Sequence, residues 1–155
     1  MKSTGIRILL VVALLAAVGI VFSFVATWRS VEVTDADAPR AALAFEMERM
    51  QIGSADPIIT FYEGGHVRRP VPAEPQPAPS TLFMLVYHRP SGRLARAEVG
   101  FWFLRMKGPA SERVLSGAGI DLQALGLTVD ELERYGPALV LDAQRGDNRV
   151  LVWTR

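Results

Sequence analysis

Histidine, serine, acidic and arginine side chains are the residues of this chain that could do chemistry, because it contains no cysteine. The absence of cysteine excludes a disulfide framework and a thiolate nucleophile. The two histidines are His66 and His88, and a zinc site would need both of them together with carboxylates from distant parts of the chain. We therefore predict no metal site and no bound cofactor.

Local patterns typical of an active site are also missing from the sequence. No serine stands in a G-x-S-x-G elbow, which is the motif that exposes a nucleophile. Gly117-Ala118-Gly119 lacks the third glycine and the lysine of phosphate-binding loops. Asp130, Glu131 and Glu133 begin a predicted helix, where acidic residues favour the helix dipole. We predict that the protein is not an enzyme.

A group of basic residues is the strongest candidate for a binding site. His88, Arg89, Arg93 and Arg96 gather around the tip of a predicted hairpin, where they would suit an acidic partner or lipid phosphates. The alternative is a solvated arginine face. Arg145-Gly146-Asp147 matches the tripeptide that integrin receptors bind, but its position predicts a hairpin turn.

An apolar segment at the N-terminus decides where these residues would act. Residues 8–28 contain no charge, and at about 1.5 Å per residue they would span roughly 31 Å, which matches the hydrocarbon core of a bilayer. Thirteen of these 21 residues are Leu, Ile, Val or Phe, and Trp28 ends the segment. The segment is predicted to be a transmembrane helix in contact with membrane lipid.

The flanking charges predict the orientation of this helix. Lys2 and Arg7 precede the segment, so the positive-inside rule places residues 1–7 in the cytoplasm and residues 29–155 on the periplasmic or extracellular side of the cell (inner) membrane. A cleaved signal peptide is the alternative. The apolar run is longer than usual for a signal peptide, and cleavage after Ala26 would place the bulky Phe24 at position −3.

The first part of the exported region is predicted to begin with a helix over residues 38–51. Within it Leu43, Met47 and Met50 fall near one face, with Phe45 off that face. Residues 58–62 and 67–69 are predicted strands joined by a turn. Five of the ten residues 70–79 are proline, which predicts a surface loop.

The second part is predicted to contain two β-hairpins, 81–106 and 138–154. In the first hairpin, residues 81–88 read as a central strand, and Ala95, Ala97, Val99, Phe101 and Phe103 share a face of the returning strand. Thr128 and Glu131 predict a capping box for a helix that closes at Gly136. The fold class is therefore predicted to be α+β: one domain with an antiparallel or mixed sheet of four to six strands and short helices.

Three functional classes fit these features. The formal net charge of +1 does not favour nucleic-acid binding. The favoured hypothesis is a single-pass membrane-anchored protein with a non-catalytic interaction or scaffolding module that binds an envelope protein. The alternatives are a ligand-binding sensor with an apolar pocket around Phe101, Trp102 and Phe103, and a tethered enzyme whose site is assembled from distant residues.

Overall fold

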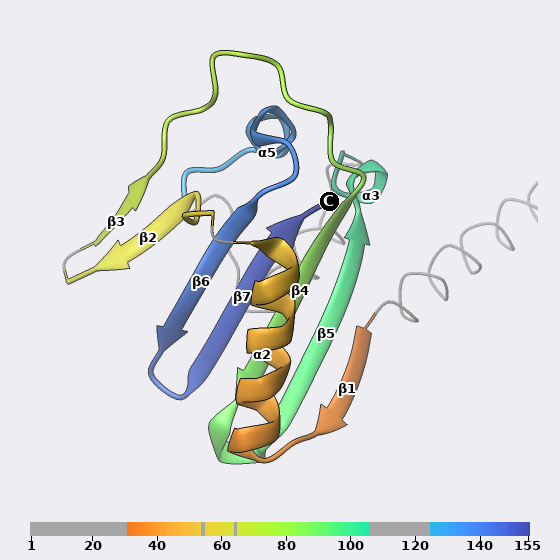
Figure 1. The fold of residues 1–155 in the computed structure, drawn as a ribbon, viewed down its shortest axis with the longest axis vertical. Helices are drawn as coiled ribbons and strands as arrows, with labels where there is room; N and C mark the ends of the chain where they lie inside the picture. The colour runs from red at the N-terminus through yellow and green to blue at the C-terminus, as the bar shows by residue number, and fades with distance from the viewer. Residues whose placement is uncertain (1–30, 54, 64, 106–124) are drawn as a thin grey trace, which may run out of the picture. The chain divides into compact units, whose positions relative to one another are not determined.

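The computed structural model describes residues 31–53, 55–63, 65–105 and 125–155. They form a small α+β domain built on one mixed sheet of seven strands in the order β1-β5-β4-β7-β6-β2-β3 (Figure 1). The strands are β1 (Val31–Asp35), β2 (Ile59–Tyr62), β3 (Gly65–Arg68), β4 (Thr81–His88), β5 (Arg93–Gly100), β6 (Leu139–Arg145) and β7 (Asn148–Thr154). The helices are α2 (Ala38–Ile52), α3 (Phe101–Arg105) and α5 (Val129–Tyr135), with a 3-10 turn η1 (Arg89–Ser91).

The sheet is mixed because β2 and β6 run parallel, with Ile59 opposite Leu141. The pairs β2–β3, β4–β5, β4–β7 and β6–β7 are antiparallel. The prediction of four to six strands was too low, since Val31–Asp35 adds an edge strand. All five of its residues are exposed, so this strand lacks the pattern of buried apolar residues by which sequence reasoning finds strands.

The predicted membrane segment, residues 8–28, lies outside the described residues, as does the predicted hairpin's last residue, Met106. Within the described ranges, no helix has the length and apolar character that crossing a membrane requires.

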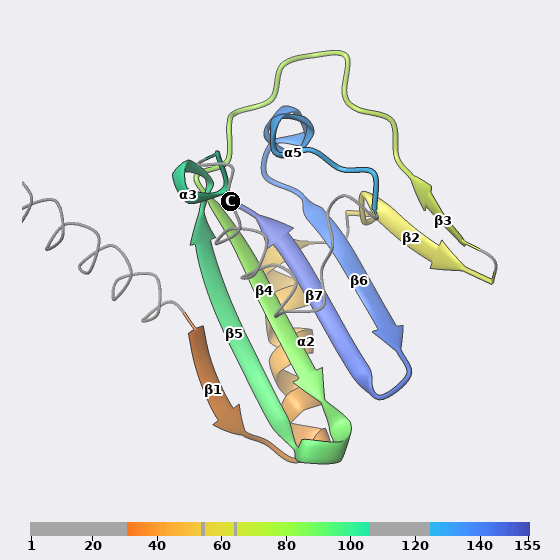
Figure 2. The ribbon, with the colours of Figure 1, turned by 180° about the vertical axis from the view of Figure 1, so that it is seen from behind.

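The two faces of the sheet carry separate apolar clusters. Leu85 and Tyr87 of β4 belong to the cluster beneath α2, whereas Leu82 and Met84 belong to the cluster on the other face, which also receives residues from α3 and α5. Figure 2 shows the sheet from behind, with α2 on its far side. Neighbouring residues of a strand point to opposite faces, so this division follows the period of two along β4. The prediction of a central strand covered on both sides is confirmed.

The first hairpin ends earlier than predicted. β5 stops at Gly100, and the run Phe101–Arg105 forms the short helix α3, in which Phe101 and Leu104 are buried. Phe101 and Phe103 therefore do not continue the strand face of Ala97. A Cβ at Gly100 would lie 2.5 Å from Nε1 of the exposed Trp102, so a larger residue at this position would require the indole ring to move. A short run of apolar residues does not distinguish a helix from a strand by periodicity, which explains the error.

The remaining predicted elements are confirmed, with shifts of one or two residues at some ends. α2 begins after the N-cap Asp37, and Thr128 and Glu131 form the capping box of α5. β3 begins at Gly65 rather than Val67. The second hairpin turns at Gly146, where φ is +58°, with Arg145 opposite Asn148.

The proline-rich residues 70–79 form neither helix nor strand, and they are part of the same domain. Val71 packs against the core cluster that contains Tyr135, and the Tyr135 hydroxyl donates to the carbonyl oxygen of Arg69. A Cβ at Gly136 would lie 2.6 Å from Cβ of Gln76. The loop therefore passes close against the C-terminal end of α5, as expected for a surface loop.

Candidate interaction surfaces

The hairpin tip, which we define as His88, Arg89, Ser91 and Arg93, brings together three of the four predicted site residues. His88 lies opposite Arg93 across the β4–β5 ladder, and its Nδ1 is 2.7 Å from the Ser91 hydroxyl. The backbone N–H of Arg89 donates to the carbonyl of Asp147, which joins this tip to the β6–β7 turn. Neither the Arg89 nor the Arg93 guanidinium has an ion-pair partner among the described residues.

Arg96, the fourth predicted site residue, is separated from the tip by the sheet geometry. It lies three positions beyond Arg93 on β5, so the two side chains leave opposite faces of the sheet. Arg96 faces α2 and forms an ion pair with Glu48. Its side chain is 42% exposed, and that of Glu48 is 9% exposed. Proximity in the chain groups these arginines, whereas the period of two along β5 separates Arg93 from Arg96.

Glu48 itself depends on this ion pair. It lies on the buried side of α2 together with Ala41 and Phe45. Its Oε2 atom is buried, and the described residues offer it no hydrogen-bond partner, as is also true of Trp153 Nε1. Arg96 is thus the group that compensates a nearly buried carboxylate, which is a structural role. The spacing of Glu48 from Ala41 and Phe45 is the sequence signal that could have identified it.

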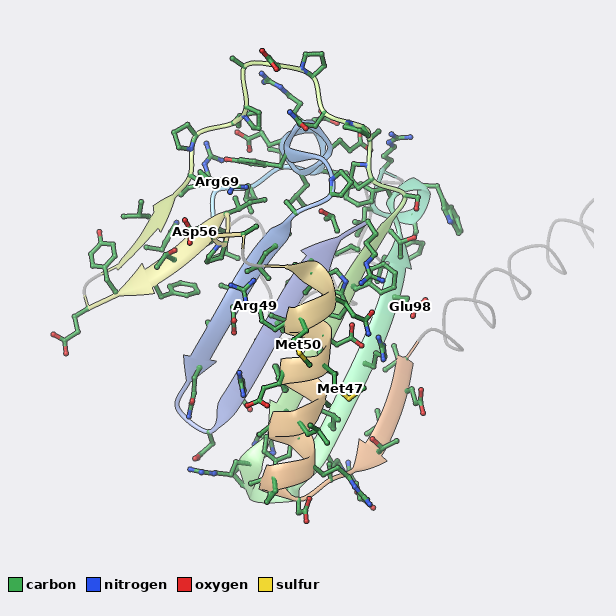
Figure 3. The ribbon with its side chains drawn as sticks, viewed as in Figure 1. Met47, Arg49, Met50, Asp56, Arg69 and Glu98 are labelled. Carbon is green, nitrogen blue, oxygen red and sulfur yellow. The ribbon has the colours of Figure 1, made fainter. Side chains whose placement is uncertain are left out.

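The opposite side of α2 carries an exposed apolar surface, which we call the α2 ridge and define as Leu43, Met47 and Met50. These side chains are 56%, 50% and 75% exposed. Their spacing of four and three residues places them in one row along the helix, and Figure 3 shows Met47 and Met50 on its outer side. The sequence correctly placed the three on one face with Phe45 off it, but Phe45 is the residue that enters the core.

The α2 ridge stands on a helix that is fixed at both ends. At the N-terminus, Oδ1 of Asp37 accepts a hydrogen bond from the backbone N–H of Arg40 at 3.1 Å. At the C-terminus, the Arg49 guanidinium donates to the carbonyl of Ala55 at 3.2 Å and lies 3.4 Å from Oδ2 of Asp142 on β6 (Figure 3). The helix therefore presents the ridge in a defined orientation.

Two titratable residues of the described ranges with shifted pKa values, Glu131 and Tyr135, have structural roles. Hydrogen bonding to the Thr128 backbone lowers the pKa of Glu131, which caps α5. Burial raises the pKa of the Tyr135 phenol in the core. His66 lies on β3 and His88 at the hairpin tip, and no group of three or more potential metal ligands occurs in the part of the chain that the structure describes.

The aromatic residues predicted to surround a pocket differ strongly in burial. Phe101 is 2% exposed and belongs to the core, while Trp102 is 58% exposed. Phe103 packs partly against the core, and its ring centre is 5.9 Å from that of Trp102. Trp102 is one of several exposed large apolar side chains outside the α2 ridge, together with Phe61 and Tyr62 of β2, Val67 of β3, and Val31 and Val33 of β1.

Comparison of the chain with protein-family models, curated proteins and solved structures found no match.

Proposed function

We propose that this protein is a single-pass membrane-anchored, non-catalytic interaction module of the cell envelope that binds another protein through the α2 ridge. The exposed row of Leu43, Met47 and Met50 is the observation that carries the proposal. The inner side of α2 packs against the sheet through Ala41 and Phe45, and both ends of the helix are held by hydrogen bonds. Its outer side exposes the three apolar residues of the ridge. Contiguous exposed apolar side chains of this kind are typical of protein contacts.

The composition of the α2 ridge suits an adaptable protein contact. Two of its three residues are methionine, whose unbranched and polarizable side chain fits differently shaped partners. Full burial of one Leu or Met side chain is worth about 1.5 to 3 kcal/mol, so the exposed fractions of the three would add roughly 3 to 5 kcal/mol before association costs. A contact of this size is modest, and it suits a partner that is held in the same membrane.

The proposed anchor is residues 8–28, with residues 1–7 in the cytoplasm and residues 29–155 on the periplasmic or extracellular side. Its support is the uncharged length of the segment and the position of Lys2 and Arg7 before it. A C-terminal alkaline phosphatase fusion is expected to be active, and a C-terminal green fluorescent fusion to be dark. The reverse pattern would overturn the orientation.

The hairpin tip is a second candidate contact. The guanidinium groups of Arg89 and Arg93 are not engaged by acidic groups of the described residues, and a carboxylate or phosphate would bind them in paired fashion. Arg96 is not part of this contact, because it lies on the other face of the sheet and is paired with Glu48.

An affinity pull-down of the full-length chain from detergent-solubilised membranes tests the proposal. The triple variant Leu43→Gln, Met47→Gln, Met50→Gln keeps good helix formers on an exposed face, so the melting temperature should change little. A partner recovered with the natural chain should be absent from the variant sample. The matched control is Arg40→Gln with Glu46→Gln, which alters charged residues beside the ridge.

Two outcomes would contradict docking through the α2 ridge. The first is an unchanged set of recovered proteins in the triple variant. The second is loss of the partner in Arg89→Ser with Arg93→Ser while the triple variant retains it, which would assign the contact to the hairpin tip.

A further inference from the structure

We propose that the outer edge of β1 pairs with β1 of a second copy of this chain, in an antiparallel register centred on Val33. β1 ends the strand order on one side, so the sheet as described has no strand beyond it (Figure 1). All five of its residues are exposed, with Val31 at 46% and Val33 at 55%. An edge strand with free main-chain groups is a template for pairing with another strand.

A hydrogen bond beside β1 indicates which of its main-chain groups face away from β5. The N–H of Ala36, the residue after β1, donates to the carbonyl of Gly92, the residue before β5, at 2.7 Å, so Ala36 points its main-chain groups toward the β4–β5 hairpin. Since successive residues of an antiparallel strand point these groups to alternate sides, those of Val31, Val33 and Asp35 are directed outward. Three residues of β1 therefore present paired donors and acceptors at the edge.

The other edge of the sheet, β3, is protected against such pairing. It has four residues, its last residue Arg68 is held by Glu131 at 3.0 Å, and the chain continues with Arg69 and Pro70. Short length, charged side chains and proline are features that block edge pairing in natural sheets. β1 has one more residue and no proline, and its two charged residues, Glu32 and Asp35, are not directly opposed in the proposed register. The contrast selects β1 as the edge open to a partner strand.

The sequence of β1 is complementary to itself in the proposed register. Centring on Val33 places Val33 opposite Val33 of the second copy, Glu32 opposite Thr34, and Val31 opposite Asp35, so no two charges of like sign are directly opposed. A shift by one residue would place Glu32 opposite Asp35 of the second copy. It would also place residues whose main-chain groups point outward opposite residues whose groups point toward β5, so the hydrogen bonds could not form. The two-fold symmetry of this arrangement is that of the commonest dimers.

Five paired residues make a small contact. The inference therefore rests on the membrane anchor of the proposed function, which would raise the local concentration of the chain. Two copies held in one membrane meet at a high effective concentration, which compensates for a small interface. The pairing is independent of the α2 ridge, because β1 and α2 use different main-chain and side-chain groups.

Disulfide crosslinking of the full-length chain in membranes tests the pairing, because the natural chain has no cysteine. Opposed residues that exchange hydrogen bonds have Cα atoms about 5.5 Å apart, which is within the range of a disulfide. With copper–phenanthroline as the oxidant, Val33→Cys should give a covalent dimer of twice the 17.0 kDa chain. Glu32→Cys and Thr34→Cys should each give at least fivefold less dimer, while the double variant should restore it.

Crosslinking of Val67→Cys on β3 is the control for random collision. Equal dimer yields from Val67→Cys and Val33→Cys would overturn the inference, as would the absence of a Val33→Cys dimer. A carbonate wash of the same membranes tests the anchor separately: a chain that stays in the membrane without a Val33→Cys dimer disproves the pairing alone. Release of the chain by carbonate, with the Val33→Cys dimer still formed, disproves the anchor alone.

Discussion

The inner and outer sides of α2 both carry large apolar side chains, but the domain covers only one of them. On the inner side, Phe45 is 1% exposed and packs against the sheet, with the Arg149 guanidinium 4.5 Å from its ring centre. On the outer side, Met50 is 75% exposed. The inner side also contains the ion pair of Glu48, which shows that apolar character alone does not decide which side is buried. The difference separates residues that stabilise the domain from residues that remain available to a partner.

Among substitutions on the two sides of α2, the largest loss in the free energy of unfolding is expected from Phe45→Ala. Removal of a buried phenylalanine side chain costs about 3 to 5 kcal/mol, because it combines a lost transfer free energy with a cavity. Met50→Ala is the matched substitution on the outer side, and it should change the free energy of unfolding by no more than about 0.5 kcal/mol. Chemical denaturation of the two variants measures the difference. Similar losses in both would show that the outer side is also packed.

A smaller loss is expected from Arg96→Ser, which leaves Glu48 without its charged partner. An unsatisfied, nearly buried polar group costs about 1 to 3 kcal/mol, and the partial exposure of Arg96 favours the lower part of this range. Arg93→Ser is the control, since it removes an arginine of the same strand from the other face and should change stability by about 0.5 kcal/mol or less. Equal effects of the two substitutions would contradict the division of the arginines between two faces.

The smallest effect on stability is expected from glutamine substitutions on the α2 ridge. Glutamine and methionine have similar helix propensity, so Met47→Gln should shift the unfolding free energy by about 0.5 kcal/mol or less. Thermal unfolding of the variant checks this expectation. A destabilisation above about 1 kcal/mol would mean that the ridge is part of the core and is not available to a partner.

Sequence reasoning succeeded where a local signal fixes a local structure. The Thr128–Glu131 capping box, the two hairpins and the proline-rich loop each follow from a few neighbouring residues, and the structure contains them. The α+β class followed from the order of these elements, whereas the sequence left open whether the sheet is antiparallel or mixed, which the parallel β2–β6 pair decides.

The sequence left open or missed what depends on tertiary contacts. Leu43 and Phe45 both fit a helical apolar pattern, and only the position of the sheet determines that Phe45 is buried. The strand period places Arg93 and Arg96 on opposite faces of β5, and Arg96 pairs with Glu48, which is remote in the sequence. Phe101 is buried as expected of a core residue, but the turn at Gly100 places it on a helix.

Photocrosslinking in intact membranes tests most directly whether the outer side of α2 is a docking surface. A photoreactive amino acid at Met47 of the full-length chain should form an adduct with a second protein, and the same group at Thr60, an exposed residue of β2, should not. The adduct should disappear when Leu43 and Met50 are replaced by glutamine. Absence of any Met47 adduct at normal levels of the chain, or equal adducts from Met47 and Thr60, would contradict the account.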